Sequence, residues 1–271
     1  METTQHAEQL ARVYGPTTWD LYAELDRSLE PRGPDWLLAK AAEYLQPGST
    51  VLDAGCRDGA HLVRLVRDHD LAGFGVDPVP LHISQAREAV EAAGLTDRIT
   101  LRCTGMEDAA SLGQQFDLVW CRDVLEQVAD LPAAIAGVAQ VLKPGGRLIV
   151  FTQVATDLLD SRDRAVLSAH LGNVLSNLDA ANLEAAFSAA GLVIEETDVL
   201  GTEWREYAEE RTQPVSRALL RLARLRRTRD QFVAVHGEDV CAHVEANLHW
   251  ELYQFLGKLA PTVYVLRRRD R

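Results

Sequence analysis

The chain has 271 residues, of which 47% are apolar and 25% are charged, values that are ordinary for a globular protein. Its formal net charge of -12 argues against nucleic acid as the main partner, because neutralising phosphates requires a basic surface. No apolar run is long enough to span a membrane, and the polar N-terminus lacks the apolar region of a secretory signal, so we expect a cytoplasmic protein.

Residues 1–45 show helical periodicity, which is interrupted at Gly15-Pro16 and at a proline-rich turn over 31–34. From residue 50 onward, short apolar strands alternate with helices. The expected strands are 50–54, 73–76, 99–103, 116–121 and 147–152, and the helices among them are 60–68, 84–93 and 131–142. This alternation implies a parallel sheet that is covered on both faces and built from right-handed crossovers.

After residue 152 the alternation weakens. A helix at 179–190 and a strand at 192–200 are followed by about sixty mainly helical residues and by a last strand at 262–268. An insertion of this size between two strands is typical of a lid or a substrate cap. We therefore expect a doubly wound, mostly parallel α/β sheet of seven strands. Its parts would be an N-terminal helical lid (1–45), a core (46–152) and a final part (153–271) with a helical cap around 203–258.

The expected cap carries a local excess of basic side chains: Arg217, Arg221, Arg224, Arg226, Arg227 and Arg229. A solvated helix face is the favoured interpretation, and an anion-binding patch is the alternative. The four cysteines of the chain lie far apart and form no CxxC pair. We therefore expect neither a disulfide framework nor a metal site.

The first expected strand runs directly into a glycine-containing turn that extends from Asp53 to Gly59. Gly55 and Gly59 permit a sharp turn with close backbone approach, and the helix that follows offers free N–H groups to a carboxylate or a phosphate. Asp77 ends the second strand, where a carboxylate can accept both hydrogen bonds of a ribose diol. These residues predict a nucleotide site at the carboxyl ends of the strands.

The same loop distinguishes two kinds of cofactor. A dinucleotide requires the pattern glycine-x-glycine-x-x-glycine to fit its pyrophosphate, whereas Arg57 stands here where a middle glycine would lie. Asp53 would repel a pyrophosphate, but it can hold the ammonium group of a methionine moiety, directly or through water. The loop therefore favours a sulfonium nucleoside, with a nicotinamide cofactor as the alternative.

Five segments in this order resemble the motifs of class I S-adenosylmethionine-dependent methyltransferases. They are 51–59 (VLDAGCRDG), 73–77 (GFGVD), 98–108, 116–120 (FDLVW) and 142–150 (LKPGGRLIV). The resemblance covers about residues 45–152 and implies a Rossmann-like methyltransferase fold with S-adenosyl-L-methionine as cofactor. The flanking helices resemble the small-molecule branch that includes ubiquinone and menaquinone C-methyltransferases and sugar O-methyltransferases of natural-product pathways.

The resemblance also implies roles for individual residues. The expected cofactor-binding set is Asp53, Gly55, Cys56, Arg57, Gly59, Asp77, Pro78, Met106, Glu107, Cys121 and Tyr14. Two positions depart from the family pattern: Arg57 stands where glycine is frequent, and Gly105 stands where an acid usually precedes the position of Met106. Glu107 or Asp108 would then have to contact the adenine amino group.

Methyl transfer needs positioning of the nucleophile and, for an oxygen or carbon acceptor, a base. The candidate catalytic residues are Asp123, just past the fourth strand, and His170 and His249, in or near the cap. Each also has a structural interpretation. Asp123 can cap a helix or pair with Arg122, and His249 lies in a run with helical aromatic spacing that is typical of a packed cap.

The expected function is an enzyme that transfers a methyl group from S-adenosylmethionine to a small-molecule acceptor, with oxygen slightly favoured over carbon or nitrogen. The acidic charge and the absence of an asparagine-proline-proline-aromatic segment weigh against nucleic-acid and protein-glutamine acceptors. The alternatives are a non-catalytic S-adenosylmethionine-binding protein and an NAD-dependent oxidoreductase. We expect a monomer or a homodimer.

Overall fold

The computed structural model describes residues 2–269, which form two compact units with a boundary between Pro31 and Arg32. The first unit contains α1 (Glu2–Val13) and α2 (Pro16–Leu25). Proline suits the start of α2, because the N–H it lacks would have no partner within the helix. No residue of α2 is buried, and the rings of Trp19 and Tyr22 lie 5.9 Å apart between centroids.

The third helix, α3 (Pro34–Ala42), belongs to the second unit. Its residues Leu37, Leu38 and Ala41 are buried in the same hydrophobic cluster as the first strand and its neighbouring helices. The first unit therefore ends before residue 45, where the sequence suggested a boundary. The lid role of the N-terminal helices stays a prediction.

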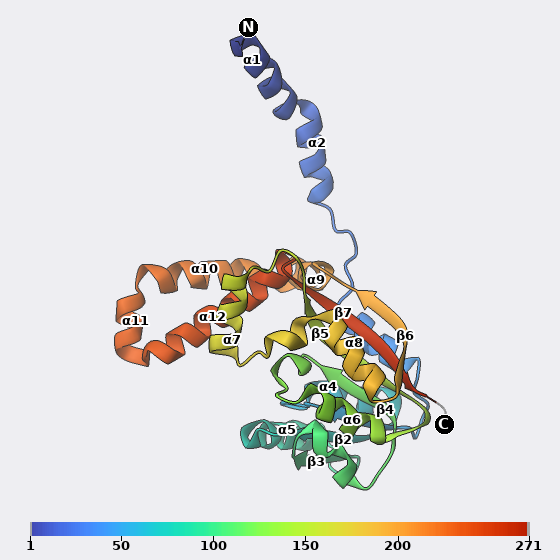
Figure 1. The fold of residues 1–271 in the computed structure, drawn as a ribbon. Helices are drawn as coiled ribbons and strands as arrows, with labels where there is room; N and C mark the ends of the chain where they lie inside the picture. The colour runs from blue at the N-terminus through green and yellow to red at the C-terminus, as the bar shows by residue number, and fades with distance from the viewer. Residues whose placement is uncertain (1, 270–271) are drawn as a thin grey trace. The chain divides into compact units, whose positions relative to one another are not determined.

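A seven-stranded sheet forms the centre of the second unit, in the order β3-β2-β1-β4-β5-β7-β6 (Figure 1). The strands are β1 (Thr50–Ala54), β2 (Ala72–Asp77), β3 (Ile99–Cys103), β4 (Phe116–Arg122), β5 (Leu142–Ala155), β6 (Leu192–Val199) and β7 (Leu259–Arg268). Neighbouring strands among β1 to β5 pair in parallel, whereas β7 is antiparallel to both β5 and β6. This confirms the expected doubly wound, mostly parallel sheet. The strand order reverses between β1 and β4, where such sheets bind their ligands.

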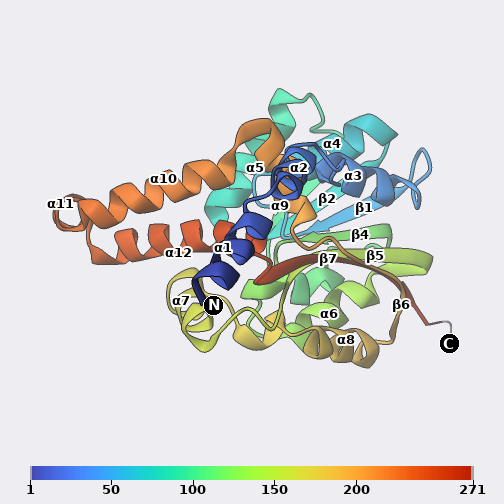
Figure 2. The same ribbon diagram turned by 90° about the horizontal axis from the view of Figure 1, so that it is seen from above.

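Helices cover both faces of the sheet (Figure 2). α3, α4 (Ala60–His69) and α5 (Pro80–Ala92) share one hydrophobic cluster, and α6 (Leu131–Gln140) and α8 (Ala180–Ala189) share the other. Successive strand residues alternate between the two clusters: Trp120 of β4 belongs to the first cluster and Cys121 to the second. Short 3-10 segments are η1 (Met106–Leu112), η2 (Leu125–Gln127) and η3 (Leu175–Leu178).

β5 is longer than the expected strand over 147–152, because the turn-like run 143–146 is included in it. The register with β4 shifts between Phe116 and Leu118, and Gly145 has a φ of +78°, a left-handed conformation that glycine adopts without strain. The turn residues therefore form a bulge within the strand.

The segment between β6 and β7 consists of α9 (Glu203–Thr212), α10 (Pro214–Arg227), α11 (Arg229–His236) and α12 (Glu238–Phe255). α10 and α12 run side by side and α11 joins their far ends; we call these three helices the cap arm (Figures 1 and 2). α7 (Ser161–Leu171) packs against α12. Among residues 2–269, no helix combines the length and the apolar character needed to cross a membrane.

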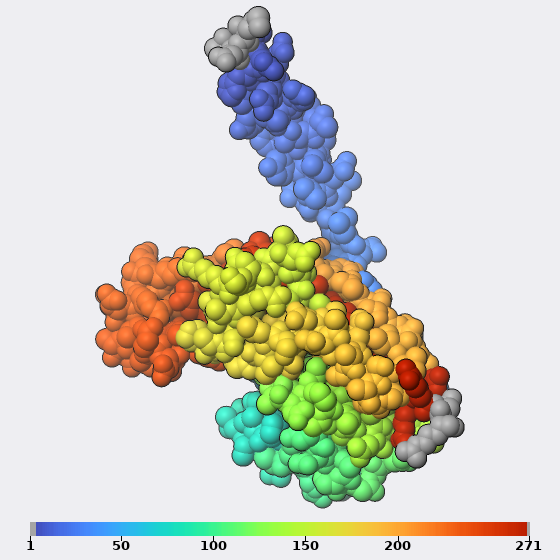
Figure 3. Space-filling view, viewed as in Figure 1, coloured from blue at the N-terminus to red at the C-terminus, as the bar shows by residue number. Residues whose placement is uncertain are grey.

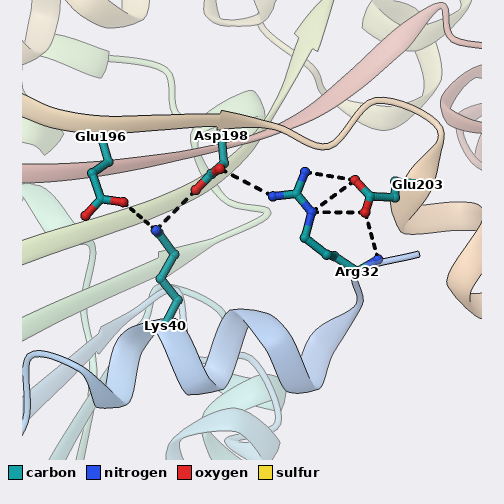
Figure 4. Close-up of polar contacts among 5 residues, drawn as sticks. All are labelled: Arg32, Lys40, Glu196, Asp198 and Glu203. Carbon is teal, nitrogen blue, oxygen red and sulfur yellow. Dashed lines mark hydrogen bonds and ion pairs between the residues drawn. The ribbon is translucent and has the colours of Figure 1, made fainter. Parts of the chain in front are cut away.

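Ion pairs join α3 to the edge strand β6 and to the start of α9 (Figure 4). The Arg32 guanidinium donates to Glu203 at 2.8 Å and to Asp198 at 3.3 Å. Lys40, which is buried, donates to Glu196 at 2.6 Å and lies 3.2 Å from Asp198. The hydrogen bond from Arg32 lowers the pKa of Glu203. Ion pairs therefore join the beginning of the second unit to its edge strand and to the start of α9.

Candidate functional site

A cavity of about 680 Å³ lies at the carboxyl ends of β1, β2 and β4, beside the reversal of strand order. Its walls come from the glycine loop after β1, the turn after β2, the start of η1, the end of β4 and the loop that leads into α6. We call it the strand-end cavity. Doubly wound sheets bind ligands at this place, and the volume falls in the range of roughly 300–1,000 Å³ that small-molecule sites occupy.

The glycine loop is held tightly against the segments on either side of it. Gly55 has a φ of +89°, and a Cβ at this position would lie 2.3 Å from Cγ2 of Val124. The backbone N–H groups of Gly55 and Cys56 donate to the carbonyl of Val76 at 2.8 and 3.0 Å. Arg57 has a φ of +47°, so it adopts the left-handed conformation that favours glycine, and its side chain is exposed at the edge of the cavity.

Asp53, at the end of β1, supplies a buried carboxyl group to the cavity wall. Burial raises its pKa to about 7, and the nearby Arg122 opposes that shift. Within residues 2–269, its carboxylate forms no hydrogen bond and no ion pair. A buried acid without a protein partner is costly unless a ligand supplies one. A cationic ligand group such as an ammonium would satisfy it.

Asp77, at the end of β2, holds its carboxylate through three donors. Oδ2 accepts from the N–H of Arg57 at 3.1 Å, and Oδ1 accepts from the N–H of Val79 at 2.9 Å and from His82 Nδ1 at 3.0 Å. Because Nδ1 of His82 donates, its Nε2 is left as an acceptor. Asp77, Val79 and His82 all line the cavity. Oδ2 of Asp77, with one donor, keeps an acceptor position for a ligand hydroxyl.

The adenine position suggested by the sequence lies at the start of η1, where Gly105, Met106 and Glu107 line the cavity. Met106 is buried, and the Glu107 carboxylate folds over Gly105: a Cβ on Gly105 would lie 2.2 Å from Oε1 of Glu107. Glu107 therefore fills the space that a side chain at position 105 would occupy. Asp108, the other candidate for this contact, does not line the cavity.

The end of β4 contributes Trp120 and Arg122, which share one face of the strand. Trp120 is 1% exposed, and within residues 2–269 its Nε1 and the Nε of Arg122 have no hydrogen-bond partner. Arg122 Nη1 lies 2.5 Å from His61 Nε2, and burial followed by the charge of Arg122 lowers the pKa of His61 to about 4. His61 is therefore a neutral acceptor for Arg122. The N–H of Trp120 and the Nε–H of Arg122 are therefore two buried donors at the cavity wall without a partner among the described residues.

Asp123 follows β4 in a left-handed conformation, with a φ of +52°, and lines the cavity. Its Oδ1 accepts from Gln153 Nε2 at 3.1 Å, and its Oδ2 lies 3.4 Å from Arg122 Nη2. Behind it, Glu126 is buried and accepts from the N–H of Gln153 at 2.6 Å. Burial, with the charge of Asp123 next, raises the pKa of Glu126 to about 7. Asp123 is thus the candidate base that the structure brings to the cavity.

The structure places the other two candidate bases away from the strand-end cavity. His249, on α12, contacts Arg226 Nη2 at 3.0 Å and the Tyr253 hydroxyl at 3.1 Å, inside the cap arm. The main-chain carbonyl of His170 accepts from Nδ1 of His243 at 2.8 Å. Neither residue lines the strand-end cavity. Their helices pack against each other, so these histidines serve contacts between α7, α10 and α12.

Three residues of the expected cofactor set also lie outside the cavity wall. Cys121 is buried in the second hydrophobic cluster, because strand alternation turns it away from the face of Trp120. Gly59 packs against α5, where a Cβ would lie 3.2 Å from the Cβ of Ala86. Tyr14 belongs to the first unit. The remaining eight residues of the expected set do line the cavity: Asp53, Gly55, Cys56, Arg57, Asp77, Pro78, Met106 and Glu107.

Sequence reasoning missed His61 and Trp120 as site residues. Strand parity could have found Trp120, because it alternates with Cys121 on the opposite face. His61 lies in the first turn of α4, directly after the glycine loop. Within residues 2–269, no group of three or more acidic, histidine or cysteine side chains is arranged to hold a metal ion.

Comparison with known proteins identifies the family and the fold. A family model described as a methyltransferase domain matches residues 26–197, more than half of the chain. A ubiquinone biosynthesis O-methyltransferase of Cereibacter sphaeroides is 38% identical over 138 residues, 50% of this chain and 49% of the relative. The chain spans about half the length of the curated relatives it matches.

Solved structures share the fold at low identity. The cyclase SpnF superposes with a TM-score of 0.67 at 21% identity, covering 88% of this chain and 81% of that one. A sarcosine dimethylglycine methyltransferase from Galdieria sulphuraria, described as putative, gives a TM-score of 0.66 at 21% identity, covering 88% and 84%. These likenesses show the Rossmann-like methyltransferase fold.

Proposed function

The chain belongs to the methyltransferase domain family, and from this premise we propose that it transfers a methyl group from S-adenosylmethionine to a small-molecule acceptor. One observation carries the proposal. Asp53, Asp77 and Glu107 follow or end three neighbouring strands and line one cavity. Three carboxylates in a row match three polar groups of that cofactor: its ammonium, its ribose diol and its adenine amino group.

The residues present fit this cofactor. The Asp53 carboxylate has no partner within residues 2–269 and would bind the ammonium. Oδ1 of Asp77 already accepts from Val79 and from Nδ1 of His82, whereas Oδ2 accepts only from Arg57 and keeps one free position. Asp77 Oδ2 and His82 Nε2 would therefore accept the two ribose hydroxyls. Glu107, which fills the space over Gly105, would accept from the adenine amino group.

When bound, S-adenosylmethionine supplies an already activated methyl group, so this chain has to bind, orient and dehydrate the reactants. We assign Asp123 as the group that accepts the proton of the acceptor, because it is the candidate base at the cavity. Gln153 and Arg122 hold its carboxylate. We favour an oxygen acceptor over carbon or nitrogen, supported by the relative named as an O-methyltransferase.

The cap helices between β6 and β7 are proposed to help enclose the acceptor. Their aromatic side chains would supply apolar surface, which a methyl-transfer site needs to exclude water. Because the acceptor would share the strand-end cavity of about 680 Å³ with the cofactor, we expect it to be a small molecule.

Calorimetric titration with S-adenosylhomocysteine and, separately, NAD⁺ tests the cofactor assignment. We expect S-adenosylhomocysteine to bind and NAD⁺ not to bind, and tighter binding of NAD⁺ would refute the assignment. A screen of phenols, catechols and sugars, read out by release of S-adenosylhomocysteine, then tests turnover. Cofactor binding without turnover on any acceptor would favour the non-catalytic alternative.

A further inference from the structure

The cap arm holds a second cavity of about 390 Å³ between α10, α11 and α12, which we call the arm pocket. It is lined by Arg221, Arg224, Leu225, Phe232, His236, Val240, Cys241, Val244 and Leu248. None of these residues lines the strand-end cavity. Figure 3 shows the end of the arm, in orange, standing away from the green and cyan parts of the core. The arm pocket is therefore a separate site.

The arm pocket has an apolar floor and apolar walls. Leu225, Cys241 and Leu248 are buried beneath it, whereas Val240 and Val244 are 52% and 44% exposed. Leaving apolar surface in contact with water is unfavourable by about 25 cal/mol per Å². An apolar chain or ring lying in this pocket would remove that surface from water.

The charges around the arm are divided between paired and unpaired arginines. Arg226 lies 3.2 Å from Glu245, and Arg229 lies 2.9 Å from the same residue. By contrast, within residues 2–269 the side chains of Arg221 and Arg224 form no hydrogen bond and no ion pair. They are three residues apart, so they share one face of α10, and both line the arm pocket.

Within residues 2–269, Arg217 and Arg227 of the same helix also form no ion pair, so Arg221 and Arg224 differ from them in lining the arm pocket. Acidic partners are plentiful on the surface and reach the neighbouring Arg226 and Arg229, but not the two arginines at the pocket. The pocket therefore joins an apolar floor to a positive rim. A guanidinium presents a planar fork of donors that matches a carboxylate or a phosphate.

We propose that the arm pocket binds a free amphiphilic anion, with its apolar chain or ring against Leu225, Val244 and Leu248 and its anionic head between Arg221 and Arg224. The wall residue Phe232 gives a flat apolar surface to that chain or ring. This site assigns a use to the arginine-rich helix that is independent of methyl transfer.

Calorimetric titration of the full chain with octanoate, octan-1-ol and acetate tests the proposal. We expect octanoate to bind about tenfold more tightly than octan-1-ol, and acetate to bind too weakly to measure. Arg221→Gln with Arg224→Gln should lower octanoate affinity about tenfold and leave octan-1-ol affinity unchanged. The matched control, Arg217→Gln with Arg227→Gln, removes the same charge from α10 outside the pocket and should change neither.

A second variant tests the floor of the pocket. Val244→Trp places an indole where the chain would lie and should abolish binding of both octanoate and octan-1-ol, while thermal melting shows that the fold is kept. Equal affinity for the acid and the alcohol, or equal weakening by both arginine pairs, would overturn the proposal. Three further outcomes would also overturn it. These are a failure of octanoate to bind, formation of a dimer by the wild-type chain that Val244→Trp dissociates, and binding of the chain to anionic vesicles without competition from octanoate.

Discussion

In the strand-end cavity, polar side chains lie on backbone that a parallel sheet holds in place, whereas in the cap arm they lie on helices that hold one another. Asp53, Asp77 and Asp123 each lie at or just after the end of a strand, and all three line the cavity. His249 and Tyr253 of the arm instead bond to each other. A sheet thus brings distant residues to one edge, while a helical hairpin uses its polar groups for its own packing.

Replacing the candidate base of each region in turn gives the largest expected effect. Asp123→Asn should lower kcat by about 10²-fold or more, because an amide cannot accept the acceptor's proton. His249→Gln should change kcat by less than about twofold, since its contacts lie within the arm. Steady-state kinetics on an acceptor identified by screening measures both. A larger loss from His249→Gln would reverse the comparison.

Cofactor affinity gives the next largest effect. Asp77→Ala should weaken S-adenosylhomocysteine binding by about 30- to 100-fold, because charge-assisted hydrogen bonds to the ribose are lost. His82→Phe should weaken it by about fivefold, since it removes a polar ring nitrogen and one support of Asp77. Calorimetry measures both, and thermal melts report folding. If His82→Phe left the affinity unchanged, the ribose would be held by Asp77 alone.

Acid should weaken cofactor binding through Asp53. Burial raises the pKa of Asp53 to about 7, so the free protein carries a protonated carboxyl below that pH and must lose the proton before an ammonium can pair with it. Affinity for S-adenosylhomocysteine should fall as pH drops below 7, by up to about tenfold per pH unit. Asp53→Asn should have weak binding that does not vary with pH. A pH-independent wild-type affinity between pH 5 and 7 would argue against an ammonium at this site.

The same raised pKa acts on stability in the opposite direction. At Asp53 the folded chain binds more protons than the unfolded chain between the ordinary pKa of an aspartate, near 3.8, and the folded value of about 7. The contribution of Asp53 to the stability of the ligand-free protein should therefore fall as pH rises through this window, whereas His61, whose pKa is lowered by burial to about 4, contributes in the opposite sense. Denaturant unfolding between pH 4 and 7 measures it. Asp53→Asn should reduce the slope without removing it, because burial also raises the pKa of Glu126 to about 7.

The smallest effect tests the ion pairs between α3 and β6. Lys40→Met keeps the aliphatic stem but removes the pairs with Glu196 and Asp198, and it should lower the free energy of unfolding by about 1–2 kcal/mol. The control, Arg64→Met, breaks a more exposed pair with Asp35 and should change it by less than about 0.5 kcal/mol. Denaturant unfolding measures both. Equal losses of unfolding free energy in the two variants would mean that the burial of Lys40 does not strengthen its ion pairs.

The difference between the two regions also explains what sequence reasoning could reach. Strand ends were predictable because hydrophobic runs, glycine turns and chain order locate them, and Asp53, Asp77 and Glu107 all line the cavity. The His61–Arg122 contact was not predictable, because it joins the first turn of α4 to the end of β4 across the sheet. In the cap, helical periodicity shows that helices exist but does not show which face each helix presents, so the contacts of His170 and His249 within the helices could not be inferred.

The position of β7 sets the order in which the chain can complete its fold during synthesis. β7 lies between β5 and β6 in the sheet, yet it follows β6 in the chain only after the whole cap. At about 5–20 residues per second, roughly sixty intervening residues delay it by about 3–12 s. During that interval β6 lacks its partner and β5 has an open edge, a state prone to pairing with other chains. Synthesis of the cap thus delays the addition of β7 to the nascent sheet, and rapid folding of the cap helices would shorten the exposure of these edges.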